Sequence, residues 1–249
     1  KQKVNDAIEG GCLEFEELQR KYLFFETLYT YLIRKSQLLL QLQKKGISDA
    51  VLFEKGNRGV LYKGTYKDKV VVAKAKWKES AAVATIENEI VWLKKLNREG
   101  IGPKLLFFSR EKDWFAYEFV EGEFILDFIG SGKEKGKIRD VIKQLLQQCR
   151  KLDELKVNKE EMLRPQKHAI VCSNGRVTMI DFERCRKTLR PKNVTQLCQF
   201  LTGAHANSLL QQKGIVIDRD KLLAAAQKYK KSQSEESFKR LEKTALGAD

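Results

Sequence analysis

The chain has 249 residues, 42% of them hydrophobic, and its formal net charge at pH 7 is +15. This length and apolar content can fill one large core or two modest ones, which excludes a disordered or fibrous chain. No run of 18 uncharged apolar residues exists, because Arg34 and Lys35 interrupt the most apolar stretch. We therefore expect no membrane span, and the first residues predict no secretory leader.

The cysteines and the net charge indicate the cellular compartment and the kind of partner. The five cysteines are an odd number and contain no Cys-x-x-Cys pair, so they predict neither a zinc site nor a disulfide framework. A reducing, cytoplasmic setting is the simplest interpretation. The positive charge is typical of proteins with an acidic partner, such as a nucleotide, RNA or an anionic surface. A lysine excess that merely keeps the protein in solution is the alternative.

Apolar residues near the N-terminus recur at alternating steps of four and three, which predicts one long amphipathic helix or two in line. The stripe consists of Leu18, Tyr22, Phe25, Tyr29, Leu32, Ser36 and Leu39. Gly46 follows two lysines, and this pattern predicts the end of the helix. We expect the stripe to pack on the next domain; a dimer face or a helical module that binds nucleic acid is the alternative.

After this helix the pattern becomes strand-like. The predicted strands are Ala50–Lys55, Val60–Tyr66 and Lys69–Trp77. Gly56–Gly59 separates the first two, and its glycines allow the backbone to turn tightly and approach a ligand, so that peptide N–H groups can point at phosphate oxygens. A plain hairpin turn explains these glycines equally well.

The third strand contains a lysine, Lys74, after a run of β-branched residues. A buried ammonium needs a charged partner, because leaving it unpaired is costly. The following helix, capped by Ser80, offers Glu87 and Glu89. We prefer Glu89, because it precedes two residues of the apolar face by four and seven positions. That face consists of Ile86, Ile90, Leu93 and Leu96.

The remaining elements follow the same signals. The predicted strands are Leu105–Ser109, Trp114–Phe119, Ala169–Cys172 and Arg176–Ile180, and the predicted helices are Ile138–Leu155, Val194–Leu210, Lys221–Tyr229 and Glu235–Leu246. Asn174-Gly175 predicts a hairpin turn between the last two strands. The second of these strands stops at Asp181, where a rigidly held carboxylate is suited to a divalent metal.

The order of glycine-rich hairpin, lysine-bearing strand and glutamate-bearing helix resembles the N-lobe of a protein kinase. From about Leu52 to Phe200 the chain is similar to small archaeal-type predicted serine/threonine protein kinases, relatives of the RIO kinases and the KEOPS-complex kinase. The closer resemblance lies in Gly56–Gly59, Glu161–Pro165, Lys167–His168, Ile180–Arg184 and Asn193–Gln196.

The resemblance implies an α+β, two-lobed protein-kinase-like fold, in which a five-stranded antiparallel sheet and one helix form the N-lobe and the C-lobe is mainly helical. The implied divisions are an N-terminal helical extension (1–48), the N-lobe (49–121) and the C-lobe (122–249). The implied activity is that of an atypical ATP-dependent phosphotransferase, which transfers the γ-phosphate to a hydroxyl of an unknown protein substrate with Mg²⁺, or Mn²⁺, as the metal.

The resemblance also implies roles for residues. Glu161 would orient the attacking hydroxyl, Lys74 would hold phosphates, and Asp181 would bind the metal together with His168. The implied ATP-binding residues are Gly56, Asn57, Arg58, Gly59, Lys74, Glu89, Glu118 and Val120, the last two in a hinge segment after the fifth strand.

The chain departs from the kinase pattern at the catalytic loop. Asn158–Met162 replaces the usual His-Arg-Asp, and we place Glu161 in the Asp position because Met162 then supplies the apolar residue that follows; Glu160 is the alternative. His168 stands where kinases have a metal-binding Asn. Imidazole suits Mn²⁺ better than Mg²⁺, so a hydrogen bond from His168 to a phosphate, or a structural role, is the alternative.

Further departures follow Asp181. Glu183 replaces the usual glycine, and we expect it to pair with an arginine rather than extend the metal site. A helix is predicted to begin near Asn193, with Gln196 completing a capping box. Because only about a dozen residues separate Asp181 from this helix, a full activation segment is not expected and the substrate stays unnamed.

These departures keep two other interpretations open. One is a catalytically impaired pseudokinase that acts as a nucleotide-binding scaffold. The other, which is compatible with both, is association with RNA or the ribosome through a basic surface. The basic residues near the C-terminus are Lys228, Lys230, Lys231, Lys239, Arg240 and Lys243. A solvated helical face is the simpler explanation of these cations.

Overall fold

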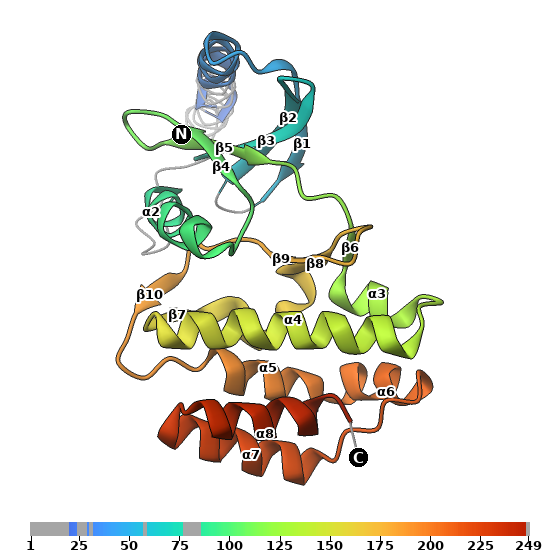
Figure 1. The fold of residues 1–249 in the computed structure, drawn as a ribbon. Helices are drawn as coiled ribbons and strands as arrows, with labels where there is room; N and C mark the ends of the chain where they lie inside the picture. Colours follow the sequence, from blue (N-terminus) through green and yellow to red (C-terminus); the bar gives the residue numbers. More distant parts are fainter. Residues whose placement is uncertain (1–19, 24–28, 30–31, 57–58, 77–85, 248–249) are drawn as a thin grey trace, which may run out of the picture. The chain divides into compact units, whose positions relative to one another are not determined.

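The computed structural model describes residues 20–23, 29, 32–56, 59–76 and 86–247 (Figure 1). The chain divides into two compact units. One consists of Lys1–Val51 and Gly64–Lys69, and the other of Leu52–Lys63 and Val70–Asp249. In the described residues, no helix combines the length and the hydropathy needed to cross a bilayer.

In the first unit, residues 32–44 are helical and the helix ends where the sequence predicts. Gly46 has a φ of +82°, a conformation that favours glycine, and its N–H donates to Gln43 O at 2.8 Å. Of the predicted apolar stripe, Tyr22, Tyr29 and Leu32 are exposed, while Leu18 and Phe25 lie outside the described residues. What this stripe packs against stays a prediction.

A five-stranded antiparallel sheet has the order β1-β2-β3-β5-β4. Its strands are β1 (Ser48–Lys55), β2 (Gly59–Tyr66), β3 (Lys69–Lys76), β4 (Leu105–Phe108) and β5 (Trp114–Glu118). The five predicted strands are confirmed, with ends that differ by one or two residues. β-Branched residues fit the pleat of β3, where Val71 and Val72 are buried.

Helix α2 (Ile86–Leu96) follows β3 and packs against β4 and β5. Its predicted apolar face is confirmed, because Ile86, Ile90, Leu93 and Leu96 are all buried. Glu89 is also buried, at 3% exposure, on this otherwise apolar face. The predicted cap at Ser80 lies outside the described residues.

The chain then continues into short strands and helices of the second unit. These are β6 (Glu123–Phe124), α3 (Ile125–Gly130), α4 (Lys135–Glu154), β7 (Val157–Lys159), β8 (Ala169–Val171), β9 (Val177–Met179) and β10 (Cys185–Lys187). Two short 3-10 turns, η2 (Glu160–Leu163) and η3 (Pro165–Lys167), lie between β7 and β8. The strands form two small sheets, β6-β8-β9 and β10-β7.

Glycines make the turns around these small sheets possible. The predicted hairpin is confirmed: Gly175 has a φ of +80°, and Cys172 N donates to Arg176 O at 2.9 Å. A side chain at Gly122 would overlap the backbone of Val171, so glycine is required for β6 to approach β8.

Helices make up the C-terminal part: α5 (Asn193–Leu201), α6 (Ala204–Gln212), α7 (Arg219–Ser232) and α8 (Glu235–Ala245). Figure 1 shows α5, α7 and α8 below α4; α5 and α8 both pack against α4, and α7 packs against α5 and α8. One apolar core runs from α2 to α8. The molecule is therefore α+β, with a helical C-terminal part.

Two predictions in this part are wrong. The helix predicted over Val194–Leu210 is broken, because Gly203 has an extended conformation (φ −67°, ψ 145°) and starts a new helix. The predicted capping box also fails. The N-cap is Lys192, not Asn193, and among the described residues its side chain makes no capping hydrogen bond.

The cysteines in the described residues, Cys149, Cys172, Cys185 and Cys198, are free thiols. Burial raises the pKa of Cys198 to about 12, so this thiol stays protonated at neutral pH. Cys12 lies outside the described residues.

Candidate functional site

Lys74 on β3 lies within reach of three carboxylates. Its Nζ is 2.7 Å from Glu89 Oε2, 3.0 Å from Asp181 Oδ1 and 3.4 Å from Glu183 Oε2. The predicted Lys74–Glu89 ion pair between strand and helix is thus confirmed. The acids come from α2 and from the segment after β9, so the fold gathers around one ammonium three groups that lie 15, 107 and 109 positions away in the sequence.

Burial and charge act in opposite directions on Lys74 and Asp181. Burial alone would lower the pKa of Lys74, but its acidic neighbours outweigh this and hold that pKa well above its ordinary value. Burial alone would raise the pKa of Asp181, but Lys74 and then Lys159 outweigh it, and the pKa of Asp181 is lowered. At neutral pH the group therefore contains an ammonium that faces the ionised carboxylate of Asp181.

Helix α2 also holds the chain that follows β9. Glu89 uses its second oxygen, Oε1, to accept the Phe182 N–H at 3.0 Å. The neighbouring Asn88 donates through Nδ2 to Glu183 O at 2.7 Å and to Cys185 O at 3.0 Å. Two adjacent side chains of α2 therefore fix the backbone from residue 182 to residue 185.

Asp181 has an unusual backbone conformation, with a φ of +64°. A residue other than glycine in this region carries strain of about 1–3 kcal/mol, which persists only where the surrounding contacts impose it. Here those contacts are the bond from Phe182 N to Glu89 and a hydrogen bond from Lys159 Nζ to the Asp181 carbonyl. Strain held in this way is a common feature of functional sites.

Lys159, at the end of β7, is a residue that the sequence analysis missed. It is fully buried, and its Nζ donates to Glu161 Oε2 at 3.2 Å and to Asp181 O, and lies 4.7 Å from the centre of the Phe182 ring. An unpaired buried ammonium is costly, so Glu161 compensates its charge. The available signal was its place two residues before Glu161.

The two candidate glutamates occupy different environments. Glu161 has a side chain only 5% exposed, and its Oε1 has no hydrogen-bond partner among the described residues. Glu160 is half-buried and pairs with Arg184 at 2.9 Å and with Arg186 at 3.1 Å. Glu161 is thus linked through Lys159 to Asp181, whereas Glu160 is held by two arginines.

His168 lies beside Asp181. Its Nδ1 is 3.5 Å from Asp181 Oδ2 and has no hydrogen-bond partner among the described residues. Burial, and then the charge of Lys159, lower the pKa of His168 to about 4. The imidazole is therefore neutral at pH 7, which is the form that binds metal ions.

The acids around Lys74 have the donor chemistry of a metal site. One oxygen from each of Glu89, Asp181 and Glu183 lies within 4.8 Å of the others. Carboxylate oxygens are preferred ligands of Mg²⁺ and Mn²⁺. The residues thus fit a divalent cation, with Glu183 rather than His168 beside Asp181 in the group. Among the described residues Glu183 forms an ion pair with Lys74, and its expected pairing with an arginine stays a prediction.

The glycine hairpin lies next to Lys74. Gly56 N donates to Gly59 O at 2.9 Å and closes the turn, while Asn57 and Arg58 lie outside the described residues. A Cβ at Gly59 would stand 2.9 Å from Ala75 O and 3.8 Å from side-chain carbons of Lys74. Close approach of β2 to β3 therefore explains this glycine, whatever ligand the turn binds.

The predicted hinge residues lie farther along the sheet. In the β3–β5 register Lys74 is opposite Phe115, whereas Glu118 is opposite Val71. Three positions correspond to about 10 Å along a strand. Val120 is half-buried in the segment between β5 and β6. The described contacts thus do not join Glu118 or Val120 to the Lys74 group.

A second buried network holds β7 in place. Asn193 Nδ2 donates to Asp153 Oδ1 at 2.7 Å and to Val157 O at 2.6 Å, and its Oδ1 accepts Lys159 N at 2.8 Å. Tyr229 donates to the other Asp153 oxygen at 3.3 Å. Burial raises the pKa of Asp153 to about 6, although these donors lower it. Asn193, expected to cap a helix, instead anchors the backbone of Lys159.

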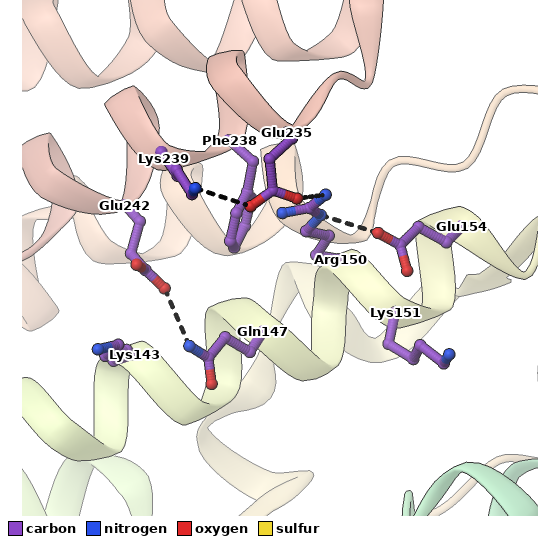
Figure 2. A pocket seen from close by; sticks show the side chains of 9 residues that line it. All are labelled: Lys143, Gln147, Arg150, Lys151, Glu154, Glu235, Phe238, Lys239 and Glu242. Atoms are coloured by element: carbon purple, nitrogen blue, oxygen red, sulfur yellow. Dashed lines mark hydrogen bonds and ion pairs between the residues drawn. The ribbon is translucent and has the colours of Figure 1, made fainter.

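A groove of about 440 Å³ lies between α4 and α8, away from these residues. Figure 2 shows Arg150 at its centre, between Glu154 and Glu235 and against Phe238. Arg150 Nε is 2.9 Å from Glu154 Oε1, and the guanidinium lies 4.6 Å from the ring centre. The charged side chains of this groove form ion pairs within α4 and between α4 and α8.

Comparison of the sequence with protein-family models gave no matching family, and comparison with curated proteins gave no match either. The interpretation of the site therefore depends on its own geometry and on the resemblance of its motifs.

Proposed function

We propose that this protein is an atypical ATP-dependent phosphotransferase of the serine/threonine kinase type, with a two-lobed protein-kinase-like fold. The observation that supports this most is the position of Lys74 Nζ, which is held by Glu89 of α2 at 2.7 Å and faces Asp181 at 3.0 Å. A fixed ammonium beside carboxylates of metal-binding type is what transfer of a phosphoryl group requires.

Lys74 binds the α- and β-phosphates of ATP in this proposal, and Glu89 orients it. Triphosphate oxygens then take over contacts that Asp181 and Glu183 make with the ammonium. Asp181 and Glu183 hold the divalent cation, with His168 beside them. When bound, that cation neutralises charge on the phosphates.

Glu161 orients the acceptor hydroxyl, and Lys159 is a positioning residue. Glu161 Oε2 lies 3.2 Å from Lys159 Nζ, which leaves Oε1 to accept a hydrogen bond from the substrate hydroxyl. Phosphoryl transfer through a loose transition state depends mainly on position and charge, so a glutamate serves in place of an aspartate.

The second candidate function is a nucleotide-binding scaffold without turnover. The burial of Glu161 favours it, because a side chain 5% exposed must become accessible before a substrate hydroxyl can reach it. Time-resolved ATP consumption, with Mg²⁺ and with Mn²⁺, separates the two candidates, since clear turnover eliminates the scaffold.

The proposal is tested with radiolabelled ATP, following both autophosphorylation and label on a generic protein substrate. Lys74→Ala and Asp181→Asn are expected to abolish transfer, while Lys69→Ala, an exposed lysine on the same strand, retains it. Thermal unfolding of each variant controls for loss of fold. Transfer that persists in folded Asp181→Asn contradicts the mechanism.

A further inference from the structure

The segment that follows Glu183, Arg184–Lys192, is unusually basic, and we refer to it as the basic segment. It carries five cations in nine residues and no acid: Arg184, Arg186, Lys187, Arg190 and Lys192. All five side chains belong to exposed residues. Because Glu183 belongs to the group around Lys74, the basic segment begins at the edge of the candidate site.

The backbone of the basic segment is held along its length. Its first part is β10, which pairs with β7 so that Cys185 is opposite Lys159. Thr188 N then donates to Lys156 O at 2.9 Å, and Lys192 N donates to Asn158 Oδ1 at 3.0 Å. The cations are thus presented by an ordered backbone, which reduces the entropy that a partner must offset on binding.

Most of this positive charge is not neutralised by the protein. Glu160 faces the segment and is shared by Arg184 and Arg186, and Glu161 lies 4.0 Å from Arg184. Among the described residues, Lys187, Arg190 and Lys192 take part in no ion pair. Such a local excess of one sign attracts and orients partners of the opposite sign.

The side chains between the cations indicate the chemical class of the partner. Leu189 is 88% exposed, and an apolar contact from a partner would cover it. The segment contains no aromatic residue, and the nearby Phe182 is fully buried. Single-stranded nucleic acids are bound largely by stacking of bases on aromatic side chains, so this surface suits an acidic polypeptide better than RNA.

We infer that the basic segment docks an acidic stretch of polypeptide that carries an apolar residue against Leu189. The inferred binding is independent of turnover, whereas its assignment as substrate binding rests on the proposed phosphotransferase. Arg184 Nε lies 4.0 Å from Glu161 Oε1, so a partner bound here lies next to the residue that orients the hydroxyl. The substrate class is then a serine or threonine flanked by acidic residues.

The test measures binding to the whole chain without nucleotide. The probe is a short fluorescein-labelled peptide of Glu, Asp and Ser with one Leu, followed by fluorescence anisotropy. We expect Lys187→Glu with Arg190→Glu to weaken binding about tenfold or more at low salt, with a smaller loss at high salt. Lys230→Glu with Lys231→Glu makes the same change of charge on α7 and is expected to leave affinity within about twofold.

Two further measurements keep the test independent of folding. Leu189→Ser changes an already exposed side chain. It is expected to weaken binding of the peptide that contains leucine, and to leave unchanged the binding of a control peptide in which serine replaces that leucine. An oligouridylate of equal charge is the RNA probe. The inference is overturned if this probe binds more tightly than the acidic peptide. It is also overturned if the charge reversals on the basic segment and on α7 weaken peptide binding equally.

The two proposals fail separately. If the chain transfers no phosphate but binds the peptide through the basic segment, the docking surface stands and the proposed activity fails. If the chain transfers phosphate but the charge reversals do not change peptide binding, the docking surface fails and the activity stands.

Discussion

Two groups of charged residues in the second unit look alike in outline and differ in surroundings. Around Lys74, one cation lies among the carboxylates of Glu89, Asp181 and Glu183. Around Arg150, one cation lies between Glu154 and Glu235. Glu89 has a side chain only 4% exposed, whereas that of Glu235 is 60% exposed.

The comparison shows that surroundings, not the number of ion pairs, decide what such a group does. Water screens the acids around Arg150, so this network contributes little to stability and its groove needs no ligand to explain its charges. The Lys74 group is largely shielded, and removal of its one ammonium would leave three carboxylates without their cation. A buried group of this kind is explained where its charges bind a ligand.

The largest effect is expected for Glu89→Ala. It removes the closest acid from Lys74 and leaves the buried Phe182 N–H without its acceptor, which should cost about 3–5 kcal/mol of unfolding free energy. Glu87→Ala, two residues earlier, removes an exposed pair with Lys112 and should cost less than about 1 kcal/mol. Urea unfolding measures both, and equal losses would contradict the comparison.

The next effect concerns Lys159, which lies with Glu161 in a second buried pair. Lys159→Met leaves Glu161 uncompensated and should destabilise the fold by about 3 kcal/mol. Lys159→Met with Glu161→Leu replaces both charges and should recover most of that loss, because two apolar partners are often tolerated where one charge is not. A double variant that is no more stable than Lys159→Met alone would refute this pairing.

A smaller effect is expected from pH, with opposite signs at two buried groups. Burial raises the pKa of Asp153 from 3.8 to about 6, so the stability that it contributes is fully present below pH 3.8 and is lost as pH rises through about 6. Burial lowers the pKa of His168 from 6.5 to about 4, so its contribution is present above pH 6.5 and is lost as pH falls toward 4.

Variants separate these two contributions. Urea unfolding of the native chain and of Asp153→Asn should give a stability difference that shifts in favour of the native chain as pH falls from 6 to 4. The corresponding difference for His168→Gln should shift the other way over the same range. Parallel curves for all three proteins would show that neither group titrates as inferred.

The smallest effect is expected for Arg150→Gln. It breaks the exposed pairs with Glu154 and Glu235 and the contact with Phe238, which together should cost about 1 kcal/mol. Salt should reduce the ion-pair part of this loss, so unfolding is measured at low and at high ionic strength. A loss as large as that of Glu89→Ala would remove the distinction between the two groups.

Much of the fold follows from local patterns. Alternation of apolar residues predicts the strands, and four-and-three spacing predicts α2, because the periods of strand and helix differ. The Lys74–Glu89 pair was also predictable. A buried ammonium needs an acid, and of the two glutamates in the described helix only Glu89 shares the apolar face.

The predictions that were wrong failed because of contacts between segments that lie far apart in the sequence. The break at Gly203 was missed because an apolar period ran across it, while an extended glycine starts a second helix. Asn193 has the residue type of a helix cap, but its acceptor oxygen Oδ1 takes the N–H of Lys159, 34 positions earlier. No local rule ranks such a partner above a nearby backbone N–H.

The sequence alone thus determined the α+β class, the strand and helix periods, and the pairing of Lys74 with Glu89, because each depends on near neighbours and on the cost of burying charge. Only the tertiary structure decided that Glu183 joins Asp181 at Lys74, that Lys159 is buried between Glu161 and Asp181, and that Glu160 is held by arginines. These outcomes depend on how β7, β9 and β10 approach α2, and a carboxylate's partner is set by that approach rather than by its place in the chain.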